Sequence, residues 1–114
     1  MDFLSKKCKP CEISTPPMPK TKAQKYLKDI QGWELAENDK LKIKRDFKFK
    51  DFKGSMDFVN NVANLAESEG HHPDIYIFYN KVNLILFTHA ASGLSQNDFI
   101  LASKINALLK PKTS

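Results

Sequence analysis

The three histidines of this 114-residue chain fall at only two places in the sequence. His71 and His72 are adjacent, and His89 stands further along the chain. A histidine side chain has an unperturbed pKa of about 6.5, so it can both donate and accept a proton at neutral pH. If the fold brings them together, these side chains could add or remove water by proton transfer.

Each of these residues also has an ordinary structural explanation. A histidine that follows a helix interacts favourably with the helix dipole, and Pro73 prevents the helix from continuing. Taken alone, the position of His71 and His72 after a helix therefore favours a structural role for them over a catalytic one. His89 alone is typical of a strand end, and Asp98 alone is typical of a helix cap.

The periodicity of apolar residues predicts the elements that must position these side chains. Helical spacing predicts helices from Lys20 to about residue 31, over 51–69 and from Ser95 onward, and alternation predicts strands over 33–37, 41–49, 75–79 and 82–89. The order α-β-β-α-β-β-α predicts an α+β domain. We expect one four-stranded antiparallel sheet with three helices packed on one face.

Local signals mark the helix ends. Gly32 is expected to end the first helix and Gly70 the second, because glycine readily adopts the left-handed conformation of a C-terminal cap. Ser95 and Asp98 resemble a capping box at the start of the last helix, with Asp in place of Glu.

The length of the chain suits a single domain, with residues 1–19 as an extended arm rich in proline and lysine and 20–110 as the folded unit. Residues 1–28 hold seven lysines and two carboxylates, so the net charge of +5 resides there and the remainder is balanced. The arm lacks the interleaved aromatic and arginine residues that bind bases, so we expect no nucleic-acid partner.

Cys8 and Cys11 are spaced as half of a zinc site, which two histidines could complete. No second Cys-x-x-Cys pair exists, and free thiols in a reducing compartment are the favoured interpretation. No apolar run approaches the roughly 20 residues of a membrane span. The sequence therefore predicts a cytoplasmic protein with no metal, no membrane partner and no targeting segment.

Several residues of the C-terminal half resemble the signature of the pterin-4a-carbinolamine dehydratases. Glu67 precedes His71-His72-Pro73, and Tyr79, His89 and Asp98 follow with the family's spacing. Three further runs of the chain are similar to bacterial members of the family. They are Lys-Lys-Cys-Lys-Pro-Cys-Glu, Gly-Trp before the first strand, and Thr-His followed by Gly-Leu-Ser. The resemblance covers nearly the whole chain.

The resemblance implies a lyase that dehydrates 4a-hydroxytetrahydropterin to quinonoid dihydropterin without a cofactor. The family serves the recycling of tetrahydropterin for aromatic amino acid hydroxylases. It also implies the fold predicted above and a functional link to such a hydroxylase. Because a core of this size is only moderately stable on its own, we also expect a homodimer or homotetramer. An alternative is a non-catalytic dimerisation or regulatory binding module on the same fold.

The family's roles transfer to matching positions of this chain. His71 and His89 are expected to move protons, and His72 to bind and polarise the hydroxylated edge of the pterin. The expected substrate-binding residues are Glu67, Pro73, Trp33 and Asp98, with Glu67 one helical turn before His71 and able to orient it. Gly70 and Asn97 depart from residues that some members carry, acidic and arginine respectively, so we expect an altered pterin affinity.

Overall fold

The computed structural model describes residues 2–8, 16–37 and 39–109. The elements along the chain are α1 (Lys20–Leu27), β1 (Glu34–Glu37), β2 (Leu41–Lys48), α2 (Phe52–Glu69), β3 (Asp74–Phe78), β4 (Lys81–Leu86), a short 3-10 helix η1 (His89–Ala91) and α3 (Gln96–Leu108). The predicted α+β class and the order of its helices and strands are confirmed.

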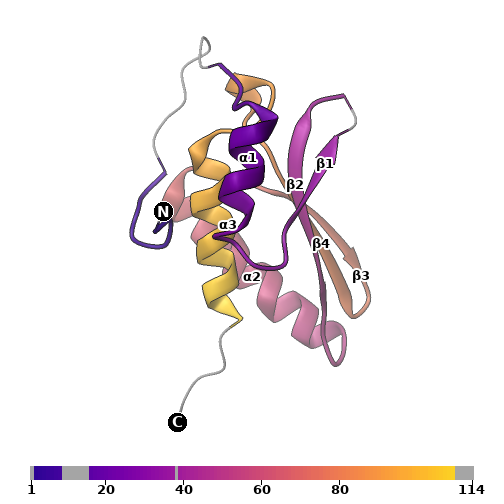
Figure 1. Ribbon diagram of the computed structural model, residues 1–114. Helices are drawn as coiled ribbons and strands as arrows, with labels where there is room; N and C mark the ends of the chain where they lie inside the picture. Colours follow the sequence, from indigo (N-terminus) through magenta and orange to yellow (C-terminus); the bar gives the residue numbers. More distant parts are fainter. Residues whose placement is uncertain (1, 9–15, 38, 110–114) are drawn as a thin grey trace.

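The four strands form one antiparallel sheet in the order β1-β2-β4-β3. The helices lie on one side of this sheet (Figure 1). Ile43 and Phe47 of β2, and Val82, Leu84 and Leu86 of β4, are buried toward that side. Their alternation with polar neighbours is what holds the register, because a one-residue slip would turn the apolar set toward water.

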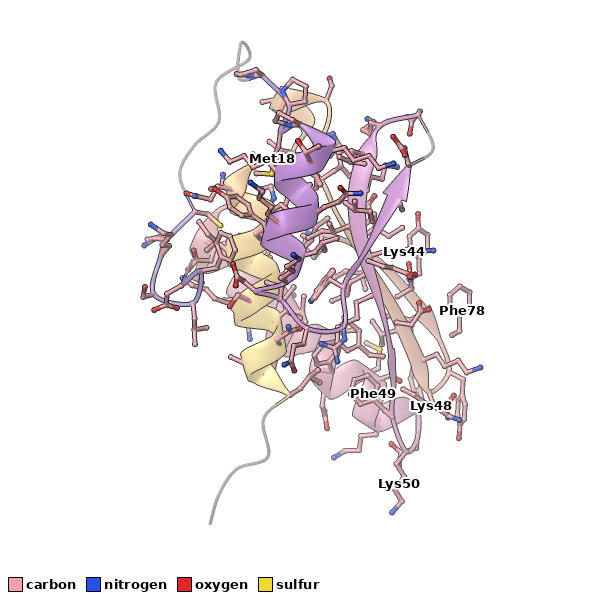
Figure 2. The ribbon with its side chains drawn as sticks, viewed as in Figure 1. Met18, Lys44, Lys48, Phe49, Lys50 and Phe78 are labelled. Carbon is pink, nitrogen blue, oxygen red and sulfur yellow. The ribbon has the colours of Figure 1, made fainter. Side chains whose placement is uncertain are left out.

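The opposite face of the sheet is polar over β2 and more apolar over β3. Figure 2 shows Lys44 and Phe78 extending from the sheet on the side away from the helices. In the register of the central strands Asp46 pairs with Asn83, and the Asn83 amide donates to the Asp46 carboxylate at 2.5 Å. The two-residue alternation along β2 thus predicts which side chains face away from the helices, although Lys42 and Lys44 on that face are half-buried.

The central helix begins and ends where its local chemistry predicts. Asp51 caps the N-terminus of α2, its carboxylate accepting a hydrogen bond from the Gly54 amide at 2.8 Å. Gly70 occupies the left-handed region, with φ of 68°, at the C-terminus. This turn directs the next residues away from the helix axis and into the region of the candidate site.

The first helix is shorter than the sequence pattern predicts. It ends at Leu27, and a turn carries Ile30 into the core, where only 1% of its surface is exposed. Gly32 therefore caps no helix; it has a φ of +87° in the loop before Trp33. The left-handed conformation of Gly32 favours glycine, and a Cβ there would also require the Arg45 guanidinium, 2.6 Å away, to move.

Residues 2–8 form neither helix nor strand, but they pack against the domain. Phe3 is 1% exposed, and its ring contacts the rings of Tyr26 and Phe99 at centroid distances of 5.0 and 5.7 Å. Cys8 is also buried in the core. The first residues of the predicted arm thus contribute to the core, while residues 9–15 lie outside the described part of the chain.

We expect Phe3→Ala to lower the free energy of unfolding by about 3 kcal/mol or more, because it removes a buried aromatic ring and leaves a cavity. Urea denaturation followed by circular dichroism measures this change. Leu4→Ala is the matched control, since Leu4 is 43% exposed. Equal effects of the two substitutions would contradict the docking of this segment.

Candidate active site

A cleft of about 440 Å³ lies where the end of α2, the end of β4 and the start of α3 meet. Its volume falls in the range of small-molecule sites. The lining residues are Gly70, His71, His72, Pro73, Asp74, Phe87, Thr88, His89, Ala90 and Asn97. The fold therefore brings all three histidines of the chain to one cleft.

His71 is held by a buried carboxylate. Its Nε2 lies 2.6 Å from Oδ1 of Asp98, and the two side chains are 11% and 0% exposed. A carboxylate in this position accepts a hydrogen bond from the Nε2–H group and so fixes both the tautomer and the orientation of the ring. Nδ1 is then the nitrogen of neutral His71 that keeps a lone pair.

The other oxygen of Asp98 is held by the chain that precedes α3. Oδ2 accepts hydrogen bonds from the Thr88 hydroxyl and the Ser95 amide, both at 2.9 Å. The Thr88 and Ser95 hydroxyls lie 2.7 Å apart. Ser95 and Asp98 complete the predicted capping box. The helix cap and the support for His71 are therefore the same carboxylate, which bonds to His71 and is not among the residues that line the cleft.

His72 pairs with Glu67, which corrects the expectation that Glu67 orients His71. Nε2 of His72 lies 2.7 Å from Oε1 of Glu67, and the side chains are 58% and 79% exposed. A helical spacing of four residues would favour His71, but Gly70 turns the chain out of the helix before that spacing is completed. An exposed pair of this kind contributes little to stability.

His89 enters the cleft from a turn rather than from a strand. The sequence predicts a strand through His89, whereas β4 ends at Leu86 and His89 begins η1. Thr88 forms an isolated bridge with Gly93, which closes this turn. The His89 ring lies 4.4 Å from that of Phe87, centroid to centroid, and its side chain remains exposed.

The two remaining predicted binding residues, Pro73 and Trp33, lie in different parts of the fold. Pro73 lines the cleft beside the histidines. The structure does not bring Trp33 there: its ring is 6% exposed, packs edge-on against Phe47, and donates from Nε1 to Asn106 near the far end of α3. Trp33 is a core residue of this chain, as large aromatic residues in small domains commonly are.

The two departures from the family pattern both lie in the cleft, because Gly70 and Asn97 line it. A Cβ on Gly70 would meet no atom within 4 Å, so the cost of a side chain there comes from its left-handed backbone alone. The expected change of pterin affinity at these positions stays a prediction.

Sequence reasoning missed Phe87 as part of the cleft and Thr88 as a support for Asp98. Alternation along the predicted strand assigns Phe87 to a face without showing what lies against it. The Thr-His pair beside the Gly-Leu-Ser run was a signal for Thr88, because it puts a hydroxyl next to both a histidine and a helix cap. Which acceptor the hydroxyl finds depends on the tertiary fold.

Cys8 lies behind this site in a setting that disfavours the thiolate. Its amide donates to Oε1 of Glu69 at 2.9 Å, and Glu69 in turn pairs with Lys104 at 2.8 Å. Burial, with the Glu69 carboxylate adding to it, raises the pKa of the Cys8 thiol from 9.0 to about 12. Cys11 lies outside the described residues, and within them no cluster of three or more His, Cys, Asp or Glu is arranged to hold a metal.

We expect Cys8 to resist alkylation by iodoacetamide at pH 8, because the thiolate is the nucleophile and its pKa is raised. The measurement is mass spectrometry of the Cys11→Ser variant, with and without urea. Modification in urea but not in buffer is the expected result. Rapid modification of the folded protein would contradict the buried position of Cys8.

Comparison with known proteins assigns the family. The family model described as Pterin 4 alpha carbinolamine dehydratase matches residues 16–108. A Nitrosomonas eutropha relative assigned to this family is 47% identical over 95% of this chain and 94% of its own. Pterin-4-alpha-carbinolamine dehydratase 2, mitochondrial, of Arabidopsis thaliana is 46% identical over 94% of this chain and 59% of its own.

Solved structures agree with this assignment. A transcriptional coactivator/pterin dehydratase from Brucella melitensis superimposes with a TM-score of 0.77 at 32% identity, over 82% of this chain and 99% of its own. A pterin dehydratase-like RuBisCO assembly factor of the alpha-carboxysome shares the fold, with a TM-score of 0.59 at 22% identity over 68% of this chain and 89% of its own. The chain therefore belongs to the pterin-4a-carbinolamine dehydratase family.

Proposed function

We propose that this protein is a hydro-lyase that dehydrates 4a-hydroxytetrahydropterin to quinonoid dihydropterin and water. The observation that carries the proposal is the meeting of all three histidines in one cleft, with His71 held by the buried Asp98. The relatives from Nitrosomonas eutropha and Arabidopsis thaliana, which are 47% and 46% identical to this chain over 109 and 110 aligned residues, are named for the same activity. The reaction serves the recycling of a tetrahydropterin cofactor.

The chemistry needs one proton donor and one proton acceptor. Protonation of the C4a hydroxyl lets it leave as water, loss of the N5 proton supplies the electron pair, and a C4a=N5 double bond forms. His71 and His89 are assigned to these two transfers, because imidazole is the side chain that commonly serves as either a general acid or a general base. His72 is assigned to binding the hydroxylated edge.

The proposal is tested by following quinonoid dihydropterin formation by stopped-flow absorbance. The substrate is generated immediately before mixing, because the uncatalysed dehydration also proceeds. A rate that rises linearly with protein concentration is expected. A folded protein that leaves the rate at its uncatalysed value would contradict the proposal.

Self-association is a second part of the proposal. The edge strand β3 and the turn after it expose Tyr76, Ile77, Phe78 and Tyr79, with Phe78 63% and Tyr79 65% exposed. Exposed apolar edge strands are sites where another chain can pair. A homodimer or homotetramer is therefore expected, and sedimentation velocity of wild type and Phe78→Lys measures it; a monomeric wild type would contradict it.

A regulatory binding module remains the competing function, because the Brucella melitensis relative is described as both a coactivator and a dehydratase. A stoichiometric protein partner without pterin turnover would favour it.

A functional link to an aromatic amino acid hydroxylase and a cytoplasmic location complete the proposal. Within the described residues, no helix has the length and apolar character of a membrane span.

A further inference from the structure

Two lysines lie against the aromatic wall of the cleft. The ammonium groups of Lys40 and Lys42 lie 4.6 and 4.9 Å from the centroid of the Phe87 ring. Phe87 lines the cleft, and its ring also lies against that of His89. Strands β2 and β4 pair antiparallel, and the last pair of their register is Ile43 with Leu86. Lys42, next to Ile43, therefore lies beside Phe87, which follows Leu86.

These two ammonium groups are only weakly neutralised. Both lysine residues are half-buried, so their positions are defined by packing rather than by solvent alone. Asp39 approaches Lys42 at 3.8 Å, but its side chain is 70% exposed, and no carboxylate of the described residues pairs with Lys40. An exposed ion pair at that distance screens a charge without cancelling it. Neither lysine is among the residues that line the cleft, but both place a positive charge next to its Phe87 wall.

The other end of the histidine group carries the opposite charge. Asp74 lines the cleft there, and Glu67 holds His72. A ligand with a charged substituent is thus oriented by the cleft, because an anion is favoured beside the lysines and disfavoured beside the carboxylates.

The position of the C6 side chain on a pterin ring links this asymmetry of charge to the dehydration reaction. C6 is bonded to N5, so a side chain on C6 leaves the ring next to the atom that loses a proton. With N5 facing His89, that side chain extends toward Phe87 and the two lysines. With the ring reversed, an anionic side chain would face Asp74 and Glu67.

We propose that the preferred substrate of this cleft is a pterin whose C6 side chain carries a phosphate monoester, bound by Lys40 and Lys42. This inference rests on the proposed dehydratase function. A phosphate monoester carries a charge of about −1.5 to −2 at pH 7, and it accepts several hydrogen bonds. It therefore matches two ammonium groups better than a neutral hydroxyl does.

The test compares two 7,8-dihydropterins that do not undergo the reaction. One has a C6 side chain ending in a hydroxyl, and the other has that hydroxyl phosphorylated. Dissociation constants are measured by fluorescence quenching at low salt for wild type, for Lys40→Gln with Lys42→Gln, and for Lys44→Gln with Lys48→Gln. The last pair is the matched control, since it removes the same amount of charge from β2, away from Phe87.

Wild type and the control are expected to bind the phosphorylated compound about tenfold more tightly than the hydroxyl compound. The Lys40/Lys42 double variant is expected to lose this preference, and 0.5 M salt to reduce it in wild type. Circular dichroism verifies that each variant is folded. Equal affinities in wild type, or a preference that survives in the double variant, would overturn the inference.

Measuring dehydration as well as binding distinguishes a failure of the inferred phosphate preference from a failure of the dehydratase function on which the inference rests. If wild type dehydrates the unphosphorylated carbinolamine but shows no preference for phosphate, the dehydratase proposal stands and the substrate class is wrong. If wild type neither binds the hydroxyl compound nor accelerates dehydration, the dehydratase proposal fails, and the inference fails with it.

Discussion

His71→Ala is expected to lower kcat/KM for dehydration of the pterin carbinolamine by about 10²- to 10⁴-fold, the usual contribution of a general acid or base. The substitution removes the imidazole that Asp98 orients in the cleft. His89→Ala is expected to act on the same scale, because the reaction needs both a donor and an acceptor. Stopped-flow absorbance with purified variants measures these losses.

His72→Ala is the matched comparison within the same cleft. Its partner Glu67 is largely exposed, so the pair can be lost without leaving a buried charge. A binding role predicts a higher KM with a smaller loss of kcat. If His72→Ala reduced kcat as much as His71→Ala does, the division of roles among the three histidines would be wrong.

Asp98→Asn is expected to reduce kcat by roughly 10²-fold or more while the protein remains folded. The Ser95 amide and the Thr88 hydroxyl both donate to Oδ2, so the amide oxygen of asparagine is required there. The amide nitrogen then faces Nε2 of His71, which must become an acceptor. The proton of neutral His71 moves to Nδ1, and the lone pair needed in the cleft is lost.

Asp57→Asn is the control for this substitution. Asp57 is an exposed carboxylate of α2 that does not line the cleft, and the carboxylate bonded to His71 is that of Asp98. The kcat of Asp57→Asn should stay within a few-fold of wild type. Comparable losses for the two variants would indicate a general effect of charge rather than the orientation of His71.

The fold was predictable from the sequence where local chemistry decides it. Asp51 caps the N-terminus of α2 and Gly70 caps its C-terminus. A capping box of Ser95 and Asp98 marks the N-terminus of α3. These interactions connect residues a few positions apart, so the sequence displays both partners. The alternation along β2 likewise displays its buried face.

The sequence could not show where tertiary contacts override local pattern. Phe87 and Thr88 continue the alternation of β4, yet the bridge from Thr88 to Gly93 turns the chain into η1. The start of α1 follows the pattern, but its end is set by the burial of Ile30. Phe3 enters the core because Tyr26 and Phe99 leave room for its ring, which no local spacing records.

The residues of the candidate cleft were predictable in part, since His71, His72, His89 and Pro73 line it and Trp33 does not, but their contacts with one another were not. The family signature identified the three histidines, Pro73 and Asp98. It did not show that Asp98 lies beneath His71, because the two are 27 residues apart and meet only when α3 packs beside the end of α2. The orientation of His71, on which the mechanism depends, is therefore a product of the tertiary fold.

The central claim is that the histidine cleft accelerates pterin dehydration. Its most direct test is a single stopped-flow experiment on wild type and on a His71→Ala, His89→Ala double variant of verified fold, at equal concentration. We predict that wild type accelerates quinonoid dihydropterin formation and that the double variant leaves it at the uncatalysed rate. Equal acceleration by both proteins, or none by wild type, would contradict the account.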